Sequence, residues 1–103
     1  GVFFDLMYAN KNGWRFDEHK QYTFMRKYKN ELLFIIVNFD SQLVDVAINV
    51  PSHAFDFLQI PQMENYQATD LLTGGKEEIC LLPYKATEVS VGAYNGKILK
   101  ITF

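Results

Sequence analysis

The chain has 103 residues and a net charge of -2, and 49% of its residues are hydrophobic and 16% aromatic. One domain of this length can bury a hydrophobic core, and the composition excludes a disordered chain and a fibrous repeat. The acidic and basic residues are spread evenly, without the basic stripe that binds nucleic acid. The longest apolar run, residues 32–37, is far shorter than the roughly 20 residues that cross a bilayer. Neither nucleic acid nor a membrane is expected as a partner.

Apolar and polar residues alternate along much of the chain, as they do in strands with one buried face. Every second residue of 44–50 is valine or isoleucine, and residues 88–91 repeat the pattern. Turn signals separate these runs too closely for helices that cross between parallel strands. We therefore predict an all-β sandwich with strands near residues 3–9, 21–28, 31–39, 43–50, 66–72, 77–82, 87–92 and 97–103.

The loop after the first predicted strand contains the only tryptophan, Trp14, close to a second aromatic residue, Phe16. An exposed aromatic ring can stack on the apolar face of a sugar. Trp14 and Phe16 are therefore candidate sugar-stacking residues. The alternative is that Trp14 packs over one end of the sandwich or against a partner domain.

The third predicted strand, residues 31–39, is apolar on both faces, and the first two strands share this property. In a two-layer sandwich only one face of each sheet meets the other sheet, so the second apolar face needs a cover from outside. We predict that this outer face docks on another domain. The predicted contact residues are Phe4, Leu32, Phe34 and Ile36.

Two asparagines lie near the ends of this strand, Asn30 just before it and Asn38 within its last two residues. Lys29 and Asn30 form a predicted tight hairpin turn, in which Asn30 takes a positive φ. Asn38 ends the apolar run, and we expect its amide to bond with the backbone of the following turn, because an unpaired buried amide costs about 1–3 kcal/mol.

Residues 51–58 contain the one predicted helix, a short surface turn that links the sheets. Ser52 is its predicted capping residue, and Pro61 stops it within two turns.

No arrangement of residues predicts catalysis or a cofactor. The two histidines, His19 and His53, have no metal-binding partner at ligand spacing. The serines lack the context of a nucleophile, and no glycine-rich loop opens a helix. Cys80 lies in an apolar run, which predicts a buried, inert thiol. No catalytic residue, metal ligand or cofactor is expected.

Five segments taken in order resemble the C-terminal domain of α-amylase family enzymes, glycoside hydrolase family 13. These are YTFMR at 22–26, LFIIVNF at 33–39, VAINVP at 46–51, DLLTG at 70–74 and VSVGAYNGKIL at 89–99. The resemblance implies an antiparallel Greek-key sandwich of eight strands that follows a (β/α)8 catalytic barrel and packs on it. Residues 1–103 would then form one C-terminal accessory domain of a larger enzyme that acts on starch-type α-glucans.

The resemblance assigns no catalytic residue to this chain, because the catalytic acids of that family belong to the barrel. One segment departs from the family pattern, since Gly92, Ala93 and Tyr94 replace a corner that usually contains proline. Without proline the backbone angle φ is less restricted. Two interpretations of Asn95 and Gly96 therefore stay open. The local pattern favours a type I′ hairpin, whereas the resemblance implies a bend where the chain changes sheets.

Three functions follow from these observations. The first is a non-catalytic accessory domain that stabilises the barrel through the outer apolar face. The alternative is a carbohydrate-binding module that contacts α-glucan through Trp14, Phe16 and either Tyr66 or Tyr84. An immunoglobulin-like adhesion module is disfavoured, because the spacing of two cysteines around a tryptophan is absent.

Overall fold

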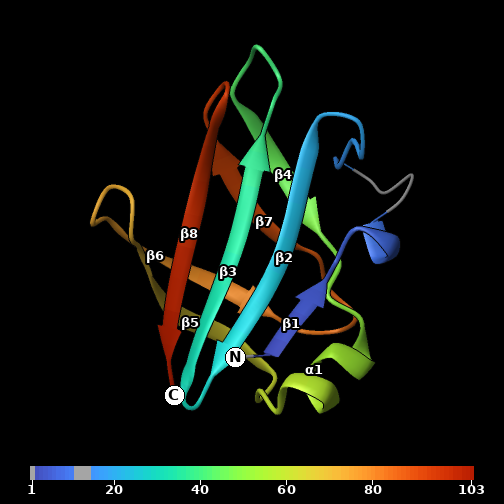
Figure 1. Ribbon diagram of the computed structural model, residues 1–103, viewed down its shortest axis with the longest axis vertical. Coiled ribbons are helices and arrows are strands. Elements are labelled where there is room, and N and C mark those ends of the chain that lie inside the picture. Colours follow the sequence, from blue (N-terminus) through green and yellow to red (C-terminus); the bar gives the residue numbers. More distant parts are fainter. Residues whose placement is uncertain (1, 11–14) are drawn as a thin grey trace.

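The computed structural model describes residues 2–10 and 15–103, which are mostly strands (Figure 1). The elements in chain order are β1 (Val2–Asp5), the 3-10 helix η1 (Tyr8–Asn10), β2 (Gln21–Tyr28), β3 (Glu31–Asn38), β4 (Val44–Ile48), α1 (Ser52–Leu58), β5 (Met63–Asp70), β6 (Lys76–Leu81), β7 (Thr87–Val91) and β8 (Asn95–Thr102). Each of the eight predicted strands corresponds to one of these strands. The first ends earlier than predicted, because the chain turns into η1.

The strands form two antiparallel sheets. The larger sheet has the order β1-β2-β3-β8-β5-β6, and the smaller one pairs β4 with β7. The strand β8 therefore separates β3 from β5, which precede it in the sequence. This arrangement confirms the predicted all-β antiparallel sandwich of eight strands with one short helix.

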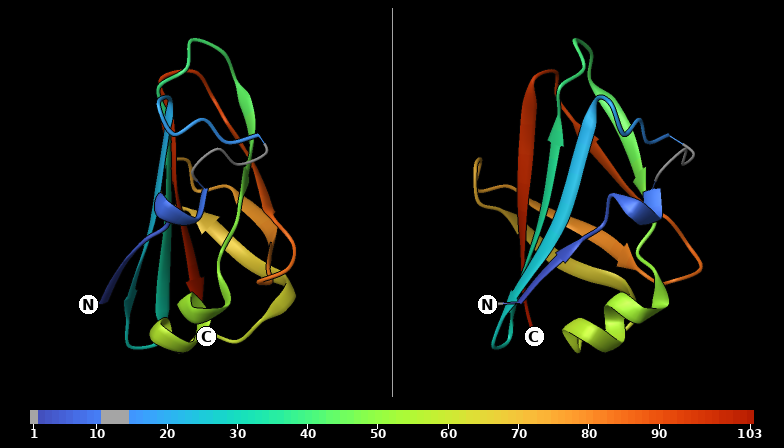
Figure 2. Two further views of the ribbon diagram at one scale, coloured as in Figure 1. Left: turned by 90° about the vertical axis from the view of Figure 1, so that its right-hand side faces the viewer. Right: turned by 45° about the vertical axis from the view of Figure 1, so that its right-hand side comes forward.

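The two layers are visible when the molecule is turned by 90° (Figure 2). One layer contains β1, β2, β3 and β8. The larger sheet curls beyond β8, so β5 and β6 pass behind β3 and β8 in Figure 1 and continue the second layer beside β4 and β7. The hydrophobic core fills the space between the layers.

Alternation along the strands builds the core. On β3 the inward side chains are Leu32, Phe34 and Ile36, which have no exposed surface. Their partners on β8 include Leu99 and Ile101, which are also buried. The second layer contributes further buried side chains, which are Val46, Ile48, Val89 and Val91.

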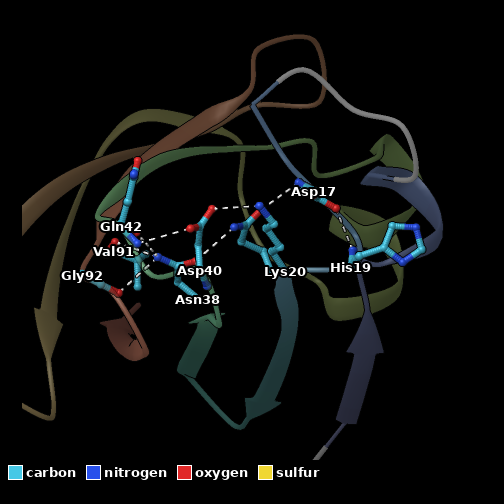
Figure 3. A network of polar contacts seen from close by, with 9 residues as sticks. Asp17, His19, Lys20, Asn38, Asp40, Gln42, Val91 and Gly92 are labelled. Carbon is cyan, nitrogen blue, oxygen red and sulfur yellow. Dashed lines mark hydrogen bonds and ion pairs between the residues drawn. The ribbon is translucent and has the colours of Figure 1, made fainter.

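A buried polar network closes one end of the sandwich (Figure 3). The Asn38 amide donates from Nδ2 to the backbone carbonyls of Gln42, Val91 and Gly92 at 3.1–3.2 Å. Its Oδ1 accepts from the backbone N–H of Asp40 at 2.9 Å and from Nε2 of Gln21 at 3.0 Å. The prediction that Asn38 bonds with the backbone of the following turn is confirmed.

The chain changes sheets between β7 and β8. β7 belongs to the smaller sheet and β8, which begins at Asn95, belongs to the larger one. Tyr94, with a φ of 48°, turns the backbone at this point. Asn95 and Gly96 therefore start a strand that has changed sheets, as the family resemblance implied, and do not form a hairpin.

Three local predictions are wrong. In the β2–β3 hairpin the positive φ, 55°, belongs to Lys29 and not to Asn30. Ser52 does not cap α1, because it is the first helical residue and the N-cap is Pro51, which makes no side-chain capping bond. Cys80 is only half-buried, because it alternates with the buried Ile79 and Leu81 on β6.

Candidate docking face and aromatic groove

The predicted contact residues of β3 lie on the opposite side of the sheet from the one predicted. Leu32, Phe34 and Ile36 face the second layer, and the chain's own core covers them completely. They cannot touch another domain, so their assignment is corrected. A strand that is apolar on both faces does not by itself indicate which face is inside.

The outer face of the larger sheet is nevertheless apolar, through the other set of residues. Leu33, Ile35 and Val37 of β3 point outward and are half-buried. Ile35 stands between Phe24 of β2 and Ile98 of β8 in the strand register. The outer apolar face consists of Phe3, Tyr22, Phe24, Leu33, Ile35, Val37 and Ile98.

Aromatic contacts extend this face toward the edge of the sheet. The ring of Phe24 lies 5.1 Å from that of Phe3 on β1 and 5.6 Å from that of Tyr22, measured between centroids. Charged residues border the apolar side chains, including the ion pair of Lys100 with Glu31 at 3.2 Å. The outer apolar face thus has the apolar centre and charged rim that are typical of an interface.

A groove of about 690 Å³ opens beside β1, where α1 passes the edge of the sheet. The aromatic groove is lined by Phe3, Phe4, Asp5, Tyr8, His53, Asp56 and Phe57. The helix buries Ala54, Phe55 and Leu58 against the core. Residues four apart share one side of a helix, so His53 and Phe57 project together beside β1.

The half-buried Phe4 is the centre of the aromatic groove. Its ring centroid lies 5.5 Å from His53, 5.7 Å from Phe57 and 6.2 Å from Tyr8, with interplanar angles of 51–56°. The rings of Phe3, Tyr8 and Phe57 are 49–58% exposed. The groove is therefore open and lined by tilted rings. A contact of Phe4 with another domain stays a prediction.

The polar groups of the groove lie among these rings. The Tyr8 hydroxyl and Nε2 of His53 are hydrogen-bonded, and Oδ1 of Asp5 accepts the backbone N–H of Met7 at 2.8 Å. Partial desolvation of the hydroxyl raises the pKa of Tyr8 above its ordinary value of 10.0, and the negative charge of Asp5 raises it further, so the hydroxyl stays protonated into more alkaline solution.

The predicted loop aromatics do not form a sugar-binding platform in the described residues. Trp14 lies outside them. Phe16 is 5% exposed and packs in the core, and Tyr66 is 6% exposed, so neither ring face is accessible to a sugar. Tyr84 is 79% exposed, but no ring contact is found for it in the described residues.

The aromatic groove was not predicted from the sequence, although two local signals pointed to it. His53 and Phe57 are four residues apart in the predicted helix, and Phe4 lies in the first predicted strand. Phe4 contacts His53 and Phe57 only because α1 passes the edge of the sheet beside β1, and local sequence patterns do not specify this packing.

Residues 2–10 and 15–103 contain neither a metal-binding cluster nor a membrane-spanning helix. No group of three or more His, Cys, Asp or Glu side chains is placed there to hold a metal ion. No helix in that part of the chain is long and apolar enough to span a membrane.

Comparison with known proteins gives a likeness in structure alone. No family model matches the chain, and no curated protein matches it in sequence. The fold is similar to part of the crystal structure of alpha-galactosidase I from Mortierella vinacea, with a TM-score of 0.59 and 12% identity over 86% of this chain. The chain spans only 22% of that protein. At this identity the likeness shows the fold, a β-sandwich that also occurs as one part of a longer chain.

Proposed function

We propose that this chain is a non-catalytic accessory domain of a glycoside hydrolase and that it packs on the catalytic domain through its outer apolar face. The observation that carries the proposal is the line of Phe24, Ile35 and Ile98 across three adjacent strands of one layer, β2, β3 and β8. Contiguous apolar surface of this kind marks interaction sites in soluble proteins.

The location of this face favours a permanent neighbour. Antiparallel sheets that face water usually carry polar residues on that side, whereas the outward positions of β3 from Leu33 to Val37 are all aliphatic. Interfaces between domains of one chain cover about 600–1,500 Å², and a patch over three strands can contribute to an area of that order. The likeness to one part of a longer glycosidase supports the same arrangement.

The finer assignment rests on the sequence motifs. Segments 33–39 and 89–99 resemble the C-terminal domain of glycoside hydrolase family 13, so the proposed neighbour is a (β/α)8 barrel acting on starch-type α-glucans. In this proposal the parent protein is the enzyme, and this chain supplies stability and solubility.

The substitution Ile35→Lys tests the docking, because it places a charge at the centre of the outer apolar face. In the chain alone it should change the unfolding free energy little, because the lysine stem can lie along the sheet with its amine in water. In the chain joined to its catalytic domain it should destabilise the docked form by about 1.5–3 kcal/mol, the contribution of one buried aliphatic side chain. Thermal and urea unfolding of both forms measure the difference.

Leu43→Lys is the matched control, because Leu43 is 65% exposed and belongs to the β3–β4 connection. It should have equal effects in the two forms. Equal effects of Ile35→Lys in the two forms would contradict the docking proposal.

The carbohydrate-binding alternative now depends on Trp14 and on the exposed Tyr84. A titration with maltoheptaose, followed by the fluorescence of the single tryptophan, tests it directly. The docking proposal expects no saturable change.

A further inference from the structure

The shape of the aromatic groove limits what it can bind. The rings of Tyr8, His53 and Phe57 are inclined to Phe4 at 51–56°, so they do not form one plane. A pyranose ring stacks best on one wide aromatic platform. Rings inclined to one another favour a smaller cation, which can lie over the face of a single ring.

The charge of the groove has one sign. Asp5 and Asp56 are exposed carboxylates on its lining, and no lysine or arginine is found among the described lining residues. Aromatic faces carry partial negative charge as well. Both features attract a cation, and the carboxylates add hydrogen-bond acceptors.

The aromatic groove is continuous with the outer apolar face. Phe3 lines the groove, and its ring also contacts Phe24 at 5.1 Å between centroids. A domain that covers the outer apolar face therefore lies next to the groove. The side chain that enters the groove would come from that domain.

We propose that the aromatic groove receives an arginine side chain of the neighbouring domain. This inference rests on the proposed docking function and names a chemical feature of the partner. Arginine fits better than lysine, because its planar guanidinium is weakly hydrated, stacks on aromatic rings and binds carboxylates through two parallel hydrogen bonds. Phe4 and Phe57 supply the rings, and Asp56 supplies the carboxylate.

The first test uses the chain alone and a small probe, N-acetyl-arginine methylamide. Aromatic NMR signals of Tyr8 and Phe57 should shift saturably with this probe. The citrulline analogue, which has nearly the same shape without the charge, should bind at least about tenfold more weakly. Equal binding of the two analogues, or no binding of the arginine probe, would overturn the proposal.

Two variants locate the binding. Asp56→Asn should weaken binding of the arginine probe about three- to tenfold, and Phe57→Leu by a similar factor. Glu64→Gln is the control, because it removes one charge from an exposed residue of β5, outside the groove, and should leave the affinity unchanged. An Asp56→Asn variant with unchanged affinity would place the probe elsewhere and contradict the proposal.

The second test identifies the source of the cation. When the chain is joined to its catalytic domain, the groove should be filled, and the arginine probe should no longer shift the Tyr8 and Phe57 signals. Unreduced binding in the joined protein would refute the neighbour as the source. Shifts caused by maltoheptaose and not by the arginine probe would assign the groove to a sugar. The probe experiments test occupancy of the groove, whereas Ile35→Lys tests docking of the outer apolar face. Each proposal can therefore be contradicted without the other.

Discussion

Asn38 shows at the scale of one residue how a polar group stabilises an apolar fold. Its two N–H groups serve three backbone carbonyls, from Gln42, Val91 and Gly92, and these belong to the β3–β4 connection and to the end of β7. One side chain thus ties both layers together at a single point. The sequence pattern predicted the local bond but not the bonds to residues more than 50 positions away.

Replacing Asn38 tests this role. Asn38→Ala should lower the unfolding free energy by about 2–3 kcal/mol, because buried backbone carbonyls lose their donors. Asn38→Asp keeps the shape but removes both donors and buries a charge, so it should destabilise more at neutral pH. Urea unfolding measures both, with Gln62→Ala as the control at an exposed amide. A loss below that of the control would disprove the structural role.

Tyr66 gives a second prediction for a single residue. Its hydroxyl donates to the carbonyl of Pro61, and burial raises the pKa of the phenol above its ordinary value of 10.0. Above that ordinary value the unfolded chain loses the proton before the folded chain does. The stability contributed by the neutral phenol is therefore full below about pH 10 and is lost as the pH rises toward the folded pKa.

Tyr66→Phe separates the two effects. The variant should be less stable at pH 7 by about 1 kcal/mol, the net contribution of one hydrogen bond, and its stability should fall less between pH 9 and pH 11. Thermal unfolding across this range measures the slope. A variant that loses stability with pH as steeply as the parent chain would exclude Tyr66 as the cause.

At the scale of an element, the β2–β3 hairpin has its turn at the predicted position, but the residue with the positive φ is not the predicted one. The sequence correctly placed the turn at Lys29 and Asn30, but it assigned the positive φ to the asparagine, which tolerates it better. Lysine in the left-handed region costs roughly 1 kcal/mol or more, because its Cβ crowds the following carbonyl. The pairs from Gln21↔Asn38 to Tyr28↔Glu31 leave Lys29 and Asn30 as the two turn residues, and the positive φ lies at the first of them.

Lys29→Gly should therefore stabilise the chain by about 0.5–1 kcal/mol, because glycine accepts a positive φ without steric cost although it makes the unfolded chain more flexible. Lys27→Gly, within the strand β2 that is paired on both sides, is the opposite control and should destabilise. Denaturant midpoints of the two variants measure the signs. Destabilisation by Lys29→Gly would show that the backbone at Lys29 is not strained.

The strand β2 explains why the faces of the larger sheet were assigned incorrectly. Its outward residues include Tyr22 and Phe24, whereas its inward ones include Gln21 and Thr23, so the more apolar set points away from the core. Gln21 and Thr23 are buried because they bond with Asn38 and with the carbonyl of Ile35. These bonds between strands cannot be read from alternation along one strand.

At the scale of the whole molecule, the sequence predicted the number and order of strands but not their pairing. Alternation and turn residues are local signals, and they located all eight strands. The partner of each strand depends on contacts that are distant in sequence, such as β3 with β8. The aromatic groove was missed for the same reason, because its residues come from β1, η1 and α1.

The middle position of β8 determines when this molecule can be completed during synthesis. The pairings within β1 to β3 and within β5 to β6 involve strands that are consecutive in the sequence. Residues 95–102 join these two groups of strands, pairing with all of β3 and with Thr69 and Asp70 of β5. Contacts of such long sequence separation form slowly. One edge of β3 therefore has no neighbouring strand until residues 95–102 have emerged. During this interval a nascent copy is most open to capture by chaperones or by another copy.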